Sequence, residues 1–93
     1  MYSNTTWSVE VRGKVRKALG KIPAQNAGAI FLVIHELQTN PFFGDIEKLK
    51  GENNSWRRRV GPYRIFYEVY QQTHSVFVYR VERRGSHTYK RSR

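Results

Sequence analysis

The amino-acid sequence predicts an α+β fold in which two helices pack on one face of a small antiparallel sheet, in the order β-α-α-β-β-β. One segment with strand-like alternation precedes two helix-like segments, and three more alternating segments follow with short turns between them. No internal repeat, linker or break in composition divides the 93 residues, which is the length of one small domain. We therefore treat residues 1–93 as a single domain.

The first half of the chain is expected to contain one strand and two helices. The strand is predicted at Thr6–Val11, where apolar and polar residues alternate. A short basic helix is predicted at Lys14–Leu19, and Gly20 is a typical residue after a helix end. The second helix is predicted over Pro23–Gln38, because proline lacks the N–H that would remain unpaired in a first turn. Its apolar residues recur at three- and four-residue spacing and are expected to form one buried stripe: Ala27, Ile30, Phe31, Ile34 and Leu37.

The second half is expected to form an antiparallel meander. Residues 41–54, which are rich in glycine and asparagine, are predicted to be a loop. Three strands are predicted after this loop: Ser55–Val60, Tyr63–Tyr70 and Ser75–Glu82. Tight connections at Gly61-Pro62 and at residues 71–74 would make neighbouring strands antiparallel. The structure of Arg83–Arg93 is left open.

Strand alternation assigns the side chains to two faces of the sheet. On the strand 63–70, the residues expected beneath the helices are Ile65, Tyr67 and Val69. The residues expected on the opposite face are Arg64, Phe66, Glu68 and Tyr70. If Trp56 points inward, Arg57 and Arg59 lie on this opposite face. Arg58 then points toward the core, where an unpaired charge is costly, so we expect its head group at an edge or the strand to be irregular there.

The chain is strongly basic, with 17 Lys and Arg against 7 Asp and Glu and a net charge of +10. Residues 56–93 hold ten of the basic residues and two of the acidic ones, and therefore carry +8 of that charge. In this half the charges alternate with aromatic and β-branched residues, which favours a folded basic surface over a disordered tail. A polyanion is the expected partner.

Several classes of protein and site are excluded by the sequence. The chain has no cysteine, which removes disulfide and thiol chemistry. It has no uncharged apolar run long enough to span a membrane and no secretory signal pattern, so a cytoplasmic location without membrane association is expected. The three histidines, His35, His74 and His87, lack metal-ligand spacing, and no phosphate-binding glycine loop or nucleophile motif is present. No metal or organic cofactor is expected.

One constellation remains with chemical potential: arginines accompanied by aromatic residues. It comprises Arg57, Arg59, Arg64, Arg83 or Arg84, and Tyr89. Guanidinium groups donate paired hydrogen bonds to phosphate oxygens, and aromatic rings stack on nucleobases. This combination suits a single-stranded RNA backbone, although a basic face that is merely solvated has the same composition. Trp56 and Tyr67 are expected to pack in the core.

An ordered set of motifs resembles the RelE-type toxins of the RelE/ParE superfamily. These motifs are Leu49-Lys50-Gly51, Trp56-Arg57-Arg58-Arg59-Val60, Pro62-Tyr63-Arg64-Ile65-Phe66-Tyr67-Glu68-Val69 and Val76-Phe77-Val78-Tyr79-Arg80-Val81. The order of elements and the Ile22-Pro23 junction between the helices are also similar. The resemblance covers nearly the whole chain, and its strength lies in the order of the motifs.

The resemblance implies a toxin of a type II toxin–antitoxin module that acts as a metal-independent, ribosome-dependent endoribonuclease. Such an mRNA interferase enters the ribosomal A site, cleaves translated mRNA by attack of a ribose 2′-OH on the adjacent phosphate, and is neutralised by a cognate antitoxin. Carried over by position, the residues implied to stabilise phosphate charge are Arg57, Arg59, Arg64 and Arg84. Tyr89 is implied to stack on the target base. Additional RNA contacts are expected from Arg58, Arg80, Arg83, Lys90 and Arg91.

The identity of the general base stays open in the sequence. Relatives often carry lysines where Arg57 and Arg59 stand, and an arginine cannot lose its proton in a protein. Glu68, on the strand face of Arg64, and His87, two residues before Tyr89, are the candidates. Alignment of the substrate within the ribosome could also suffice without a protein base.

Two other functions fit parts of the sequence. One is a ParE-like toxin that acts on DNA gyrase and cuts no RNA, and the other is a non-catalytic RNA- or ribosome-binding module. The nuclease hypothesis requires guanidinium groups from separate strands to meet in one solvent-facing hollow. Arginines scattered over the molecule, or held in ion pairs within the chain, would count against it.

Overall fold

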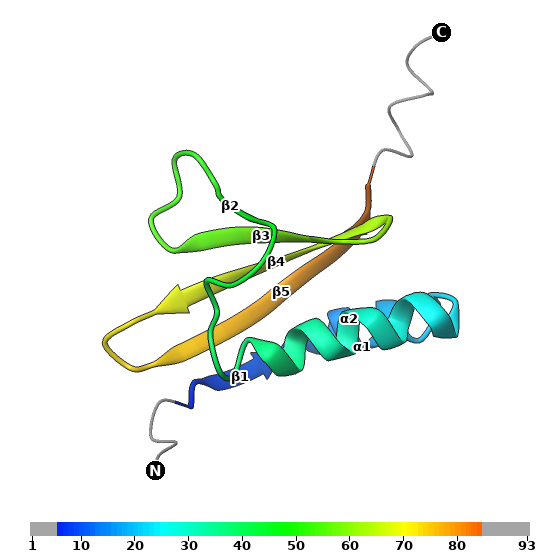
Figure 1. Ribbon diagram of the computed structural model, residues 1–93, viewed down its shortest axis with the longest axis horizontal. Coiled ribbons are helices and arrows are strands. Elements are labelled where there is room, and N and C mark those ends of the chain that lie inside the picture. Colours follow the sequence, from blue (N-terminus) through cyan, green and yellow to red (C-terminus); the bar gives the residue numbers. More distant parts are fainter. Residues whose placement is uncertain (1–5, 85–93) are drawn as a thin grey trace, which may run out of the picture.

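The computed structural model describes residues 6–84, which form two helices and a five-stranded sheet (Figure 1). The elements in chain order are β1 (Ser8–Val11), α1 (Gly13–Leu19), α2 (Ala24–Glu36), β2 (Ile46–Lys48), β3 (Ser55–Val60), β4 (Tyr63–Tyr70) and β5 (Ser75–Arg83). Figure 1 shows both helices together on one side of the sheet, whose strand order is β1-β5-β4-β3-β2. The α+β class and the placement of the helices are therefore confirmed.

The sheet differs from the predicted antiparallel sheet at both of its edges. β1 pairs parallel to β5, with Ser8 opposite Ser75. The long connection through the two helices carries the chain from β1, at one edge of the sheet, to β2, at the other edge. The strands that follow then bring β5 back beside β1 in the same direction. At the other edge, β2 lies inside the predicted loop 41–54 and pairs antiparallel with β3. Three residues are too few for alternation to reveal a strand, so β2 is defined only by its partner.

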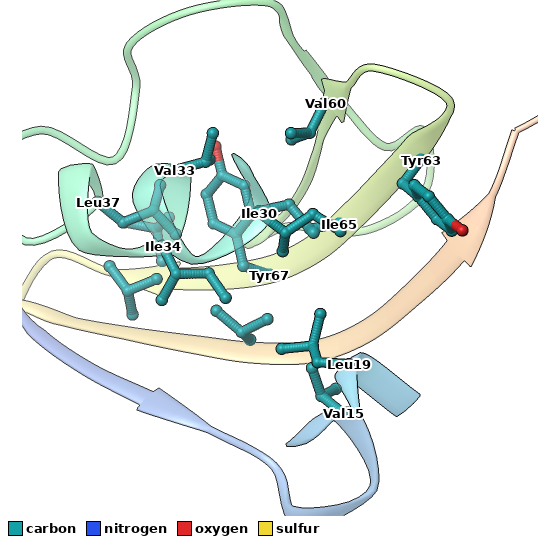
Figure 2. Close-up of a cluster of buried hydrophobic side chains, with 13 residues drawn as sticks. Val15, Leu19, Ile30, Val33, Ile34, Leu37, Val60, Tyr63, Ile65 and Tyr67 are labelled. Atoms are coloured by element: carbon teal, nitrogen blue, oxygen red, sulfur yellow. The ribbon is translucent and has the colours of Figure 1, made fainter. Parts of the chain in front are cut away.

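The hydrophobic core lies between the helices and β3, β4 and β5, as Figure 2 shows. Tyr67 is fully buried against α2, and its hydroxyl donates a hydrogen bond to the Pro41 carbonyl oxygen (2.7 Å). Burial raises the pKa of Tyr67 to about 12. Ile65, Tyr67 and Val69 of β4 are buried, as alternation predicted, but Phe66, on the opposite face, is also only 8% exposed. Helix α1 contributes Val15 and Leu19 to the core beneath the helices.

Phe31 is an error in the predicted stripe of the second helix. Its side chain is 54% exposed, whereas Val33, which was not in the predicted stripe, is buried. Successive residues on an α-helix point about 100° apart, so Ile30 and Phe31 cannot both face the centre of the core. Figure 2 shows Ile30, Val33, Ile34 and Leu37 directed toward Tyr67, which defines the buried side of α2.

Arg58 lies on the helix side of the sheet and is largely buried, with 11% of its side chain exposed. Its guanidinium donates a hydrogen bond to the Phe43 carbonyl oxygen (2.9 Å) and pairs with Glu36 Oε1 at the end of α2 (3.2 Å). A Cβ on Gly44 would lie 2.6 Å from Arg58 Cζ, and this glycine has a φ of +95°. Arg58 thus joins α2, the segment before β2, and β3, which explains how the core accommodates its charge.

A β-bulge in β5 changes the faces that simple alternation would assign there. Tyr67 pairs with Val78 and the preceding Phe66 pairs with Arg80, so Tyr79 is the extra residue. As a result, Val81 packs against the core, whereas Arg80 and Glu82 share the opposite face.

None of the helices in the described chain has both the length and the apolar character needed to cross a bilayer.

Candidate nucleic-acid interface

Four arginines from three neighbouring strands share the sheet face opposite the helices, which we call the arginine face. They are Arg57 and Arg59 of β3, Arg64 of β4 and Arg80 of β5. Residues directly opposite in an antiparallel ladder point to the same side, and the register sets Arg59 opposite Arg64. It also sets Phe66 between Arg57 and Arg80. The predicted outward direction of Arg57, Arg59 and Arg64 agrees with this register.

Each of these four guanidinium groups contacts a carboxylate. Arg57 is hydrogen-bonded to Glu47, and Arg59 Nη1 lies 3.9 Å from Asp45 Oδ2. Glu82 forms ion pairs with two arginines at once: its Oε2 lies 3.1 Å from Arg64 Nη2, and its Oε1 accepts a hydrogen bond from Arg80 Nη2 (2.8 Å). The arginine face therefore presents cations whose charge is largely compensated within the chain.

Register explains why carboxylates gather here. Like charges directly opposite each other destabilise a ladder, and Arg59 and Arg64 are such a pair. Asp45 on one side and Glu82 on the other offset this repulsion. The hydrogen bond from Arg57 holds the pKa of Glu47 below its ordinary value, and the charges of Arg57 and the neighbouring arginines lower it further.

The hollow at the β2 edge has a volume of about 210 Å³ and combines the two β3 arginines with two carboxylates. Its lining residues are Asp45, Ile46, Glu47, Arg57 and Arg59. Arg64 lies across the ladder from Arg59, outside this lining. Guanidinium groups of separate strands thus share one face, but the hollow itself holds only those of β3. The ion pairs are the feature that counts against the nuclease hypothesis.

Aromatic rings lie among the arginines. The ring centroids of Phe66 and Tyr79 are 6.3 Å apart, and Arg80 Cζ is 5.2 Å from the Phe66 centroid. The Tyr79 hydroxyl lies 3.4 Å from Ser55 Oγ. Tyr79 was not among the predicted site residues, because its position depends on the bulge.

Arg83, the last residue of β5, and Arg84, which follows it, make different contacts. Arg83 is paired with the buried Tyr63, and its Cζ lies 5.9 Å from that ring centroid. Arg84 Nη1 donates to the Gly61 carbonyl oxygen (2.8 Å), and its backbone N–H donates to the Pro62 carbonyl oxygen. Arg84 is therefore held at the turn that joins β3 and β4, the strands that carry Arg59 and Arg64, whereas Arg83 lies over the ring of the buried Tyr63.

Arg58 does not belong to this surface, contrary to the predicted RNA contact. It is largely buried on the helix side, where its guanidinium contacts Glu36 and Phe43. This position keeps the Arg58 guanidinium away from the arginine face.

Glu68 lies on the arginine face by register, opposite Ser55 and Phe77. It is four residues from Arg64 along β4, about 13 Å at the rise of a strand. Its Oε1 accepts a hydrogen bond from the Tyr70 hydroxyl (3.0 Å), and this contact raises the pKa of Tyr70. The carboxylates that touch the arginines are instead Asp45, Glu47 and Glu82.

The remaining predicted residues lie outside the described part of the chain: His87, Tyr89, Lys90 and Arg91. Between residues 6 and 84, no group of three or more metal-ligating side chains is arranged to hold an ion. What the described surface can do chemically is bind an oxyanion that displaces its carboxylates, since guanidinium groups recognise phosphate with paired N–H donors.

Two helices on one side of an open five-stranded sheet are the fold that this chain shares with RelE toxins of known structure. A crystal structure of an archaeal RelE–RelB complex from Pyrococcus horikoshii matches with a TM-score of 0.77 and 26% identity, over 87% of this chain and 98% of that one. A RelB–RelE complex from Methanococcus jannaschii matches with a TM-score of 0.68 and 31% identity, over 89% and 98%. The isolated Escherichia coli RelE toxin, at 20% identity and a TM-score of 0.72, shares the fold over 90% of this chain and 92% of its own.

Sequence comparison places the chain in a family. Residues 6–87 match the family described as the ParE toxin of the type II toxin–antitoxin system parDE. The proposed toxin RelE1 of Methanocaldococcus jannaschii is 31% identical over 81 residues, which are 84% of this chain and 90% of that protein. The chain therefore belongs to the ParE toxin family and is a RelE-type toxin of the RelE/ParE superfamily.

Proposed function

We propose that this toxin cleaves translated mRNA in the ribosomal A site without a metal ion. In this reaction the ribose 2′-oxygen bonds to the adjacent phosphorus while the bond to the 5′-oxygen breaks. The products are a 2′,3′-cyclic phosphate end and a 5′-hydroxyl end. The protein then has to stabilise charge on phosphorus and to accept and return one proton.

The observation that carries the proposal is the placement of Arg57, Arg59 and Arg64 on one face by two adjacent strands. A pentacoordinate phosphorus carries more negative charge than the phosphodiester from which it forms. Cations that are already positioned stabilise this charge more than the ground state, which lowers the barrier. Arg84, held beside the β3–β4 turn, is the fourth guanidinium proposed for this role.

The ion pairs on this face fit the proposal if RNA replaces the carboxylates. Arg59 and its partner Asp45 are both more than half exposed, and Glu47 is 65% exposed. Exposed ion pairs contribute about 0–1 kcal/mol, so a doubly contacted phosphate is a stronger partner than the carboxylate it displaces. Displacement also makes the rate depend on a tightly held substrate, which agrees with a reaction that proceeds only inside the ribosome.

Glu47 is the carboxylate proposed to accept the 2′-hydroxyl proton. It lines the same hollow as Arg57 and Arg59, whereas Glu68 lies farther along β4. While Arg57 holds it, Glu47 is a weak base because its pKa is lowered. Transfer of Arg57 to the phosphate would remove that hydrogen bond and increase the basicity of Glu47 at the moment it is needed.

Two macromolecular partners follow from the charge and from the relatives. The ribosome is an RNA polyanion, and a chain with a net charge of +10 should associate with it in a strongly salt-dependent manner. The archaeal relatives were solved as complexes of RelE with RelB. We propose a cognate antitoxin for this toxin as well, with an acidic segment that covers basic surface.

The test is cleavage of a defined mRNA by purified toxin, with and without translating ribosomes, followed by mapping of the 5′ ends. We expect cuts within codons only when ribosomes are present, and cyclic phosphate on the upstream fragment. Arg64→Ala should lose at least about a hundredfold in rate. Arg16→Ala, a change at a basic residue of α1, is the matched control and should cleave normally.

Other results would replace the proposal by one of its rivals. Inhibition of DNA gyrase supercoiling by a toxin that leaves mRNA intact would establish the gyrase-directed function. Ribosome binding without cleavage would establish a non-catalytic binding module. Equal cleavage of naked RNA would reject ribosome dependence, and a folded Arg64→Ala protein that cleaves normally would remove Arg64 from the mechanism.

A further inference from the structure

A larger hollow lies at the opposite end of the sheet from the β3–β4 turn. Its volume is about 710 Å³, and it is formed where the β2–β3 connection and the β4–β5 turn come together. Figure 1 shows these two connections at the same end of the sheet. Tyr70, which lines the hollow, is six residues from Arg64, or about 20 Å along β4. The hollow is therefore distant from Arg64, and its lining includes none of the four guanidinium groups of the arginine face.

Four carboxamide side chains line the hollow: Asn53, Asn54, Gln71 and Gln72. The first pair comes from the β2–β3 connection and the second from the β4–β5 turn. None of these carboxamides forms a hydrogen bond within residues 6–84. Each one offers two N–H donors and a carbonyl acceptor, so the hollow concentrates free donors and acceptors of both kinds.

Aromatic rings form the other part of the lining. Trp56 is held by Phe42, whose ring meets it edge-on at 5.4 Å between centroids. Lys48 Nζ lies 6.0 Å from the centre of the Trp56 ring. Tyr70 is 39% exposed, and Glu68 fixes its hydroxyl. The hollow thus has rings that are held in place by neighbours and one cation beside them.

We propose that this hollow binds an unpaired nucleobase of single-stranded RNA. A nucleobase has a flat face that stacks on aromatic rings and an edge that carries both donors and acceptors. Trp56 and Tyr70 supply rings, and the carboxamides supply groups that pair with such an edge. Lys48 is placed to meet the phosphate that accompanies the base. The proposal rests on the proposed function only in that the toxin encounters RNA.

Other occupants fit the lining less well. Of the described residues that line the hollow, Lys48 alone is charged, so an acidic peptide would find one cation for its several carboxylates. An apolar helix would leave the four carboxamides buried without partners, which is costly. A nucleobase satisfies both the rings and the carboxamides, and it needs no more than one cation.

The experiment follows side-chain NH₂ and indole N–H signals by NMR while the complete toxin is titrated with a short single-stranded RNA. The RNA carries 2′-O-methyl groups, so it cannot be cleaved and the result is independent of catalysis. We expect the signals of Asn54, Gln71 and the Trp56 indole to shift. An oligonucleotide of the same length without bases should leave these signals unchanged.

Variants give the proposal a second readout. The double variant Asn54→Ala/Gln71→Ala should bind the RNA about tenfold more weakly, the effect expected for loss of two hydrogen bonds to one base. Its control is Gln25→Ala, which removes an exposed carboxamide of α2 and should bind normally. Both affected residues lie in exposed connections, so the double variant is expected to fold.

Three outcomes would overturn the inference. The first is RNA binding with unchanged hollow signals and full affinity in the double variant. The second is an equal response to the oligonucleotide without bases, which would mean that only phosphate is bound. The third is stronger perturbation by a polyglutamate peptide, which would assign the hollow to an acidic protein segment. A toxin that fails to cleave mRNA but passes these tests would retain the base-binding hollow and lose only its proposed enzymatic function.

Discussion

The arginine face and the hollow that contains Trp56 differ in whether their polar side chains have partners within the chain. On the arginine face every guanidinium of Arg57, Arg59, Arg64 and Arg80 contacts a carboxylate of the same chain. At the hollow that contains Trp56, the carboxamides have no hydrogen-bond partners within the described chain. The charged surface must therefore exchange partners to bind a ligand, whereas the uncharged one has its donors and acceptors ready.

This difference teaches that a surface cannot be judged by its count of basic residues. Exchange of an ion pair gains little free energy in the ground state but can favour a transition state whose charge is greater. Free carboxamides and rings add affinity without regard to charge, and their contribution should persist at high salt. A toxin with both surfaces could hold RNA at one end and react with it at the other.

Among the variants that follow, the largest effect is expected from Glu47→Gln, which tests whether the carboxylates of the arginine face only compensate charge. We expect cleavage to fall about a hundredfold, because the proposed base is lost, while RNA binding becomes tighter, because Arg57 is freed. Rates with ribosomes and affinities for uncleavable RNA give the two numbers. Glu52→Gln is the control, and unchanged cleavage would reduce Glu47 to a counterion.

Arg58→Ala tests whether the contacts of Arg58 with Glu36 and Phe43 stabilise the fold beneath the arginine face. The change removes contacts to Glu36 and Phe43 and leaves a gap beside Gly44, so we expect a loss of about 2 kcal/mol in the free energy of unfolding. Urea denaturation measures it. Arg16→Ala, on the surface of α1, should change stability by less than about 0.5 kcal/mol. Equal effects of the two variants would contradict a stabilising role for the contacts of Arg58.

Tyr67→Phe probes the layer beneath both surfaces. Loss of the hydrogen bond to Pro41 should cost about 1 kcal/mol. In the native state the raised pKa of Tyr67, about 12, favours the protonated phenol, so its contribution is present below pH 10 and is lost as the pH rises from 10 to 12. Over this pH range the free energy of unfolding should therefore fall less steeply with pH in the variant than in the wild type. Identical slopes would show that the pKa of Tyr67 is not raised by folding.

The smallest effect is a change in the titration of Glu47, which sharpens the description of the arginine face. Its pKa should lie below 4.5 in the wild type and move back toward 4.5 in Arg57→Gln, as NMR of the carboxyl group can measure. Because the folded pKa is depressed, the associated stability is present above the ordinary pKa and is lost as the pH falls through the lowered value. Arg12→Gln, a change just after β1 at the sheet edge opposite β2, should leave this titration unchanged.

Local pattern predicted most of the fold, because helix and strand periodicity are properties of neighbouring residues. The strands β3 and β4 lie where alternation predicted them, and the outward direction of Arg57, Arg59 and Arg64 followed from the same rule. The second helix ends at Glu36, two residues before the predicted end, and β5 extends one residue farther, to Arg83. These shifts do not change any face.

The candidate site was less predictable. Glu47 belongs to a strand of three residues that is recognised only by its pairing with β3, and Asp45 directly precedes this strand. Arg80 and Glu82 face the arginines because of a bulge, which no alternation rule anticipates. Charge counting had assigned +8 to residues 56–93, yet two of the carboxylates that offset the arginines come from the other half of the chain.

The amino-acid sequence by itself determined the α+β class, the order of the main elements and the side of β3 and β4 on which the arginines lie. Only the tertiary structure decided which acids those arginines meet, that Arg58 is buried, and that two turns rich in carboxamides form one hollow. The physical reason is distance along the chain: periodicity acts between close neighbours, whereas ion pairs, clamps and hollows join segments that meet only when the sheet assembles.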